Sequence, residues 1–151
     1  VATYGIDVLG DWPEVCPADL DRMAAELLAG RARCNTLAAP LNDQDRIADP
    51  NVVKVVRAPD GHAIYFSRAV VPHARTGTRG ALRHIGVYGF ATELLHGLQE
   101  LPSSELAAGE SLEQLRWLEN RIPIQVLDAE GDPWGIETRS DYEAFLARIQ
   151  P

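Results

Sequence analysis

Apolar residues recur with a helical spacing in four segments of the chain. We expect helices over residues 17–29, 92–99 and 111–120, and a last helix that begins at residue 140. Pro17 suits the first position of the first helix, where its missing N–H is not needed. Ser140 and Glu143 have the spacing of a capping box, which predicts the start of the last helix.

Shorter segments rich in β-branched and aromatic residues predict strands. They cover residues 4–9, 34–41, 52–58, 62–69, 83–90 and 122–127. Asp60 and Gly61 lie between the third and fourth of these, and an Asp-Gly pair accepts the positive φ of a tight turn. These two strands should therefore form an antiparallel hairpin. We expect a polar loop over residues 42–51 and a mobile loop over residues 75–80.

The alternation of strands and helices determines the expected fold class. A helix between two strands commonly returns the chain for a parallel pairing. We therefore predict an α/β fold with a mainly parallel sheet, to which the hairpin is an antiparallel addition. Because 151 residues is the size of one ordinary domain, residues 1–151 are expected to form a single domain.

Charge and cysteine content disfavour several classes of protein. Fourteen basic and 22 acidic side chains give a net charge of −8, whereas a general nucleic-acid binder needs a basic face. No apolar run approaches the roughly 20 residues that cross a bilayer, and no signal peptide opens the sequence. We expect a cytoplasmic protein that binds neither nucleic acid nor membranes. Cys16 and Cys34 have no metal-site or redox spacing and are expected to be free thiols.

One segment reverses the acidic character of the chain. Between Gly61 and Thr92 there is no Asp or Glu, but arginines occur at positions 68, 75, 79 and 83. A local excess of positive charge can attract a small anion even in an acidic protein. The alternative is that these arginines pair with acids elsewhere in the fold.

Polar residues in and after the predicted strands suit a binding site. Asp11 follows the first strand, where it could hold a metal ion or be an ordinary turn residue. His84, Gly86, Tyr88 and Phe90 share one face of a later strand. Gly86 would leave room there for a polyhydroxylated ligand to approach the backbone. The alternative is an edge strand with ordinary polar residues.

Two further segments carry candidate ligand-binding groups. Glu113 and Gln114 begin a predicted helix and could bind a ligand, although Ser111 and Gln114 also fit a capping box. Glu137 could share a Mg²⁺ ion with Asp11, because Mg²⁺ commonly takes one or two carboxylates and completes its octahedron with phosphate oxygens and water. Taken alone, Glu137 is a loop glutamate.

Five segments together resemble a known family. They read GDWP at 10–13, PNVVKVV at 50–56, IYFSRA at 64–69, RHIGVYGF at 83–90 and ESLEQLR at 110–116. Their order and spacing are similar to the second part of 3-deoxy-manno-octulosonate (Kdo) cytidylyltransferases, the CMP-Kdo synthetases. The resemblance implies a nucleotidyltransferase with a Rossmann-like fold that joins Kdo to CTP and releases pyrophosphate for lipopolysaccharide biosynthesis. It also implies a requirement for Mg²⁺ and a cytoplasmic homodimer.

The same resemblance implies a role for individual residues. Asp11 matches the catalytic acid that holds the metal, and Glu137 stands where the family usually has a second metal-binding aspartate. The positions that match the family's sugar pocket are Arg68, His84, Tyr88, Glu113 and Gln114. An arginine suits the carboxylate of an acidic sugar, and the other side chains suit its hydroxyls. The implied reaction is in-line attack of the anomeric hydroxyl on the α-phosphorus of CTP.

The chain departs from the family pattern in two ways. The family reads Gln-Gly-Asp-Glu-Pro where this chain has Leu9 and Trp12 around Gly-Asp, so an amide and an acid beside the metal site are replaced. The family's first strand and its glycine-rich loop with Arg and Lys, which cradles the triphosphate, have no counterpart in these 151 residues, where Lys54 is the only lysine.

These departures leave three hypotheses open. The first is a fragment of a CMP-Kdo synthetase that contains the sugar-binding and dimer-forming part. The second is a non-catalytic dimerisation or acidic-sugar-binding module derived from that family. The third is a cytidylyltransferase for another acidic sugar, such as a sialic acid.

Overall fold

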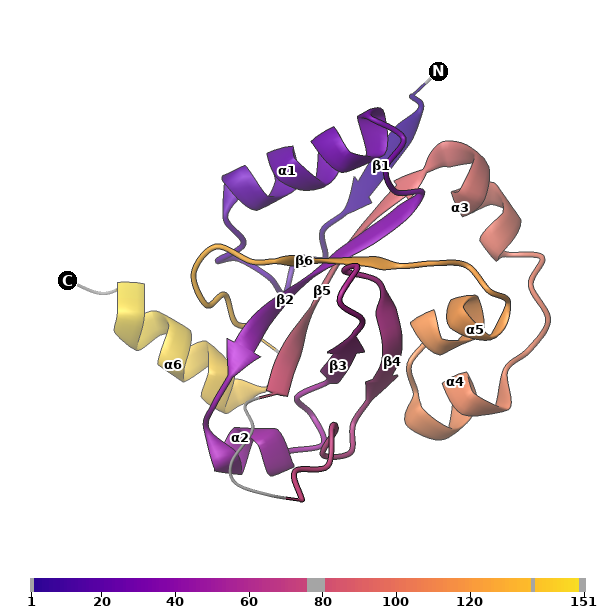
Figure 1. The fold of residues 1–151 in the computed structure, drawn as a ribbon. Coiled ribbons are helices and arrows are strands. Elements are labelled where there is room, and N and C mark those ends of the chain that lie inside the picture. The colour runs from indigo at the N-terminus through magenta and orange to yellow at the C-terminus, as the bar shows by residue number, and fades with distance from the viewer. Residues whose placement is uncertain (1, 76–80, 137, 150–151) are drawn as a thin grey trace.

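The structure, a computed structural model, describes residues 2–75, 81–136 and 138–149. Its strands are β1 (Tyr4–Asp7), β2 (Cys34–Leu41), β3 (Lys54–Arg57), β4 (Ala63–Ser67), β5 (Ala81–Ala91) and β6 (Gln125–Asp128). Its helices are α1 (Pro17–Leu28), α2 (Gln44–Ala48), α3 (Thr92–Leu98), α4 (Glu105–Glu110), α5 (Gln114–Glu119) and α6 (Arg139–Ile149). The strands form one sheet with the order β4-β3-β5-β2-β6, and β1 also pairs with β5 (Figure 1).

The central strand β5 determines the direction of the pairings. It runs antiparallel to β1, β2 and β3, and β3 runs antiparallel to β4. Among the described residues only the β2–β6 pairing is parallel, so the prediction of a mainly parallel sheet is wrong. The physical reason is the place of β5. Strands β1, β2, β3 and β6 share one direction, as an α/β fold requires, but β5 separates β2 from β1 and β3.

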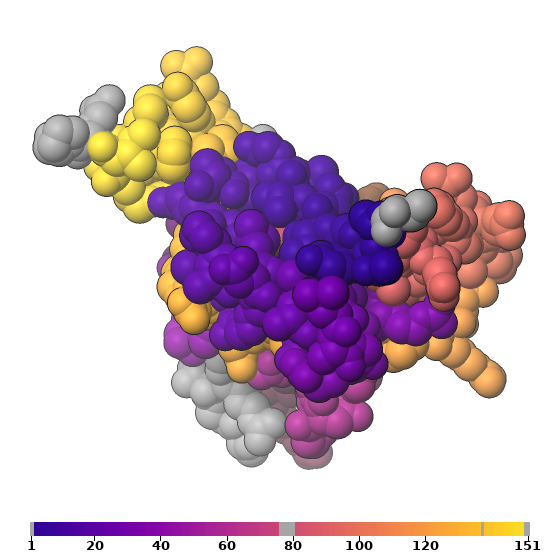
Figure 2. Space-filling model, turned by 90° about the horizontal axis from the view of Figure 1, so that it is seen from above, coloured from indigo at the N-terminus to yellow at the C-terminus, as the bar shows by residue number. Residues whose placement is uncertain are grey.

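Helices cover both faces of the sheet. On one face, Met23 of α1 packs against Leu37 and Ala39 of β2. On the opposite face, Ala38 of β2 belongs to a second cluster that includes Trp117 of α5 and residues of α3. This alternation follows from the period of two along a strand. Figure 2 shows the α1 side of the molecule, from which α6 projects at one end.

The predicted hairpin and the two free thiols are confirmed. Strands β3 and β4 pair in antiparallel register, and Gly61 in their connection has a φ of 89°, which favours glycine. Cys16 and Cys34 are both free cysteines. Of the predicted mobile loop, residues 76–80 lie outside the described ranges.

Two short helices were not predicted, and two cap assignments are wrong. Helix α2 lies in the expected polar loop, and α4 precedes α5. Ser111 ends α4 in the left-handed region, with a φ of 51°, and so does not cap α5. The capping box of α6 uses Thr138 and Asp141 instead of Ser140 and Glu143. The N–H of Thr138 donates to Asp141 Oδ2 (2.8 Å), and the N–H of Asp141 donates to Thr138 Oγ1 (3.2 Å).

No helix in the described ranges combines the length and the apolar character needed to span a lipid bilayer.

Candidate functional site

A cavity opens where β1 and β3 diverge along the same edge of β5. Strand β1 pairs with residues 88–91 of β5, whereas β3 pairs with Leu82 and Arg83. The middle of β5 therefore faces a cavity of about 700 Å³ instead of a neighbouring strand. The prediction that His84, Gly86, Tyr88 and Phe90 share one face is confirmed, since all four line this cavity. The alternative of an edge strand is wrong, because β5 lies at the centre of the sheet.

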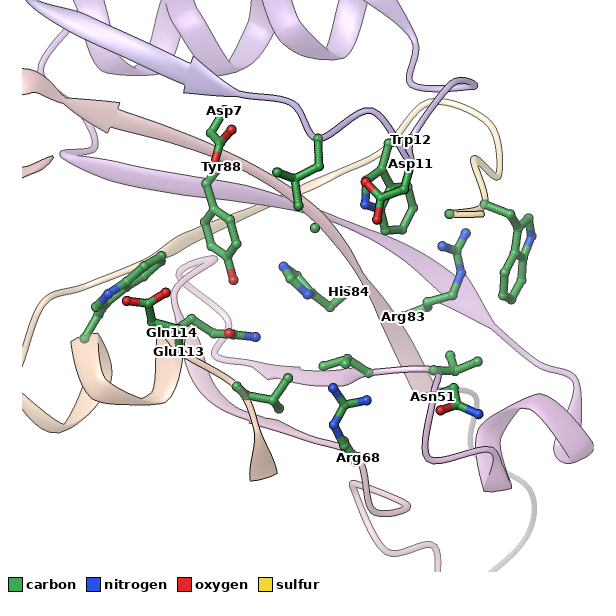
Figure 3. Close-up of a pocket in the computed structure, with 18 of the residues that line it drawn as sticks. Asp7, Asp11, Trp12, Asn51, Arg68, Arg83, His84, Tyr88, Glu113 and Gln114 are labelled. Atoms are coloured by element: carbon green, nitrogen blue, oxygen red, sulfur yellow. The ribbon is translucent and has the colours of Figure 1, made fainter. Parts of the chain in front are cut away.

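The structure brings the predicted site residues together. The six that lie in the described ranges all line this one cavity: Asp11, Arg68, His84, Tyr88, Glu113 and Gln114 (Figure 3). They come from the segment after β1, the end of β4, the middle of β5 and the start of α5. Glu137, the seventh predicted residue, lies outside the described residues.

Arg68 is held by backbone carbonyl groups. It donates from Nε to the carbonyl of Glu110 (2.8 Å), from Nη1 to that of Pro50 (3.0 Å) and from Nη2 to that of Ser111 (3.4 Å). Carbonyl oxygens orient the guanidinium without cancelling its charge. Three of its five N–H groups are used, so two remain for a ligand in the cavity.

The carboxylate of Glu110 fixes the backbone on which Arg68 stands. One oxygen accepts from the Ser67 hydroxyl (2.6 Å), and the other accepts from the Arg68 N–H (2.8 Å). These hydrogen bonds lower the pKa of Glu110 below its usual value. The α4 helix is thereby tied to the end of β4.

Lys54, for which the sequence predicts only a place in a strand, is fully buried. Its Nζ donates to the carbonyls of Asp49 (2.9 Å), Val52 (2.6 Å) and Arg68 (2.6 Å), which uses all three of its protons. Burial lowers the pKa of Lys54, while Asp49 and Glu110 act in the opposite direction. The one feature of the sequence that could have drawn attention to Lys54 is that it is the only lysine in the chain.

His84 is buried in the cavity wall and uncharged at neutral pH. Burial, assisted by the neighbouring Arg83, lowers the pKa of His84 to about 3. Its Nε2 lies 3.0 Å from Thr36 Oγ1, and its ring packs edge-on against Phe66, with centroids 5.0 Å apart. A neutral imidazole in this position offers hydrogen bonds to a ligand instead of a positive charge.

Tyr88 and the start of α5 form the neighbouring part of the cavity (Figure 3). The Tyr88 ring packs edge-on against Trp117, with centroids 5.0 Å apart. Its hydroxyl is buried without a hydrogen-bond partner among the described residues, and burial raises the pKa of Tyr88. Glu113 and Gln114 lie at the beginning of α5, where Gln114 is buried and the Glu113 side chain is largely exposed. An unpartnered hydroxyl beside these side chains suits a polar ligand.

Trp12 occupies the space beside Gly86, which the sequence predicts to be open. A methyl group on Gly86 would stand 3.1 Å from Trp12 Nε1, and one on Gly135 would stand 3.3 Å from the indole Cζ2. Both glycines therefore make room for the indole. Gly86 lines the cavity, but the Trp12 indole fills the space that its missing side chain leaves.

Asp11, beside Trp12, has the character of a cation ligand. Its Oδ1 is buried and has no hydrogen-bond partner among the described residues. A carboxylate oxygen in this state fits a bound cation, which would satisfy it. The described residues contain no group of three or more His, Cys, Asp or Glu side chains arranged to hold a metal.

Arg83 was not singled out individually from the sequence. It is almost fully buried, and its Nη2 pairs with Asp132 Oδ1 at 2.5 Å. The Cζ atoms of Arg83 and Arg46 lie 3.9 and 3.8 Å from the ring centroid of Trp134, so both guanidinium groups contact the indole. The alternative that arginines of the acid-free segment pair with distant acids thus holds for Arg83. Arg68 forms no direct ion pair among the described residues, although its charge interacts with the Glu110 carboxylate.

Comparisons with known proteins agree with this arrangement. A family model described as cytidylyltransferase matches residues 2–124. The 3-deoxy-manno-octulosonate cytidylyltransferase of Acidobacterium capsulatum is 40% identical over 141 residues, which are 92% of this chain and 57% of that protein. The enzyme of the same name from Myxococcus xanthus is 41% identical over 147 residues, which are 96% of this chain and 59% of that protein.

A solved structure is similar over almost the whole chain. It is the CMP:2-keto-3-deoxy-manno-octonic acid synthetase complexed with CTP, with a TM-score of 0.87 and 28% sequence identity. The match covers 99% of this chain and 64% of that one. This chain thus spans about three-fifths of the length of the relatives that it matches.

Proposed function

Because this chain belongs to the cytidylyltransferase family, we propose that it forms the sugar-binding part of a CMP-Kdo synthetase. The observation that carries the proposal is the convergence of Asp11, Arg68, His84, Tyr88, Glu113 and Gln114 on one cavity. Four segments far apart in the sequence supply these side chains. The curated relatives named 3-deoxy-manno-octulosonate cytidylyltransferase support the choice of Kdo as the sugar.

In this proposal Arg68 binds the carboxylate of Kdo. Its guanidinium is oriented by three carbonyl groups and keeps two unused N–H donors. A charged donor paired with a carboxylate forms a stronger hydrogen bond than two neutral groups do. The sugar hydroxyls would then meet the uncharged polar groups of His84, Tyr88 and Gln114, with Glu113 at the entrance.

Asp11 is proposed to hold Mg²⁺ through its unpartnered oxygen, and Glu137 stays a prediction as the second ligand. When bound, Mg²⁺ would supply positive charge to the phosphate oxygens of CTP. The anomeric hydroxyl of Kdo would lose its proton to water and form the new O–P bond at the α-phosphorus, and pyrophosphate would leave with the electrons of the broken P–O bond. We propose that the remaining two-fifths of the relatives' length supplies the contacts to the triphosphate.

The runner-up is a non-catalytic module that binds an acidic sugar or dimerises. Trp12 favours it, because an indole stands beside Asp11 where the resemblance implies an acid. The single domain, the homodimer and the cytoplasmic location stay predictions.

The proposal is tested by titrating the chain with Kdo in a calorimeter. We expect saturable binding that Arg68→Gln weakens at least tenfold, which is about 1.4 kcal/mol. Arg31→Gln is the matched control, since Arg31 is exposed and pairs with Glu26 outside the cavity. Absence of Kdo binding to the folded chain would overturn the proposal, and tighter binding of a sialic acid would favour the other sugar.

Catalysis is tested separately, by pyrophosphate release from CTP and Kdo with Mg²⁺. The chain is assayed alone and joined to the first two-fifths of the Acidobacterium capsulatum relative. We expect release from the joined protein and its loss in Asp11→Asn. Kdo binding without release from a folded joined protein would establish the non-catalytic module instead.

A further inference from the structure

Strand β5 contains a bulge opposite β2, directly beside His84. Thr36 pairs with Tyr88 while the next residue, Leu37, pairs with Ile85, so Gly86 and Val87 are extra residues on β5. Carbonyl groups in such a bulge lose their ladder partners and need others. The fully buried side chain of Thr36 provides one, since its Oγ1 donates toward the carbonyls of Val87 (2.8 Å) and Ile85 (3.2 Å).

The same hydroxyl contacts His84, and this determines where the imidazole proton lies. Thr36 Oγ1 carries one proton, and a carbonyl oxygen can only accept. The proton must therefore point to the backbone carbonyls, of which Val87 is the nearer. If it pointed instead to His84 Nε2, two oxygens would face each other at 2.8 Å with no hydrogen between them. Thr36 Oγ1 thus accepts from Nε2, which lies 3.0 Å away.

We propose that Thr36 is a positioning residue that fixes His84 as the Nε2–H tautomer, so that Nδ1 is a hydrogen-bond acceptor in the wall of the cavity. Nδ1 has no hydrogen-bond partner elsewhere in the part of the chain that the structure describes. The pKa of about 3 keeps the ring neutral, so Nδ1 carries no proton at neutral pH.

The consequence is selection for a hydroxyl donor at this point. An acceptor nitrogen binds a sugar O–H and repels the lone pairs of an anion, which leaves Arg68 as the group for the carboxylate. The identification of the ligand as Kdo rests on the proposed function, whereas the tautomer of His84 does not depend on it. The two parts can therefore fail independently.

The first test is a long-range ¹H–¹⁵N correlation spectrum of the ¹⁵N-labelled chain at neutral pH. For His84 we expect a pyridine-like Nδ1 signal and a pyrrole-like Nε2 signal. The exposed side chains of His62 and His96 serve as internal references. A protonated Nδ1, in either the other tautomer or the cation, would overturn the proposal.

The second test compares Thr36→Ser, which keeps the hydroxyl, with Thr36→Val, which keeps the shape. We expect Thr36→Ser to retain the protected Nε2–H signal and nearly wild-type affinity for Kdo. Thr36→Val should lose that signal and bind Kdo about tenfold more weakly, the size of one hydrogen bond. Thr92→Val is the control, because Thr92 donates to the Ala2 carbonyl on the exposed surface.

The outcomes separate the two proposals. If the wild type shows the expected tautomer but does not bind Kdo, the proposed function fails and the positioning role of Thr36 stands. If both Thr36 variants weaken Kdo binding equally while the His84 signals stay unchanged, Thr36 has a structural role only. Should Thr36→Val not fold, the wild-type and Thr36→Ser spectra still decide the tautomer.

Discussion

His84 makes the stability of the chain depend on pH above the range in which carboxylates titrate. Burial, with a contribution from Arg83, lowers its pKa from 6.5 to about 3 in the folded state. Between these two values the unfolded chain binds a proton at this position and the folded chain does not. The free energy of unfolding therefore falls as the pH falls through 6.5, and it continues to fall until about pH 3.

The size of the effect follows from the two pKa values. Proton linkage for one group with these values gives a loss of about 2 kcal/mol between pH 7 and pH 5. This is a substantial part of the roughly 5–15 kcal/mol that stabilises a typical domain. Above pH 5 most carboxylates are still ionised, so they contribute little to the slope.

The assay is urea unfolding at pH 7, 6 and 5, for the wild type and for His84→Gln. Glutamine does not titrate, and its amide can replace the Nε2–H that donates to Thr36. The wild type should lose about 2 kcal/mol more than the variant over this range. Parallel pH profiles for the two proteins would refute the reasoning, because they would show that His84 takes up a proton in the folded state.

Three further substitutions test the packing of the fold, all by urea unfolding. Lys54→Met should lower the free energy of unfolding by about 2–4 kcal/mol, because three buried carbonyl groups lose their charged donor and the relieved desolvation penalty of the ammonium offsets only part of this loss. An unchanged urea midpoint would contradict the stabilising role of the Lys54 hydrogen bonds. Gly89→Ala should lower the free energy of unfolding by more than about 2 kcal/mol, because its methyl group would clash with Asn35 Oδ1. Gly97→Ala, in open space on α3, should instead stabilise by about 0.5–1 kcal/mol.

Elements with a strong periodic signal were predicted well. Strand β2 covers Cys34–Leu41, as the sequence predicts, and α1 ends one residue before the predicted end. Helices α2 and α4, of five and six residues, are too short to show a period. Their starts depend on single caps, Asp43 and Ser104, whose side chains accept hydrogen bonds from the first turn. Asp and Ser are also common in turns, so the sequence did not distinguish a short helix from a turn at these positions.

Only those site residues could be predicted that lie in segments resembling the family. Arg68, His84 and Tyr88 were found in this way. The contacts that orient them join positions far apart in the chain, such as Thr36 with His84 and Lys54 with Arg68. Trp12 was noticed as a replaced acid, but its packing against Gly86 and Gly135 depends on how three segments meet. Composition and periodicity carry no information on such pairs.

The wrong prediction of strand direction and the position of the predicted site residues around one cavity have the same physical origin. Had β1, β2 and β3 been neighbours in a parallel sheet, their ladders would have been continuous. Because β5 lies between them in the opposite direction, β1 and β3 share one of its edges and leave its middle uncovered. His84 and Tyr88 face the cavity from the two ends of that uncovered stretch, while Ile85 and Val87 pack beneath α1. The antiparallel strand β5, placed between β2 and the pair β1 and β3, thus creates the cavity that its polar residues line together with Arg68 and Asp11.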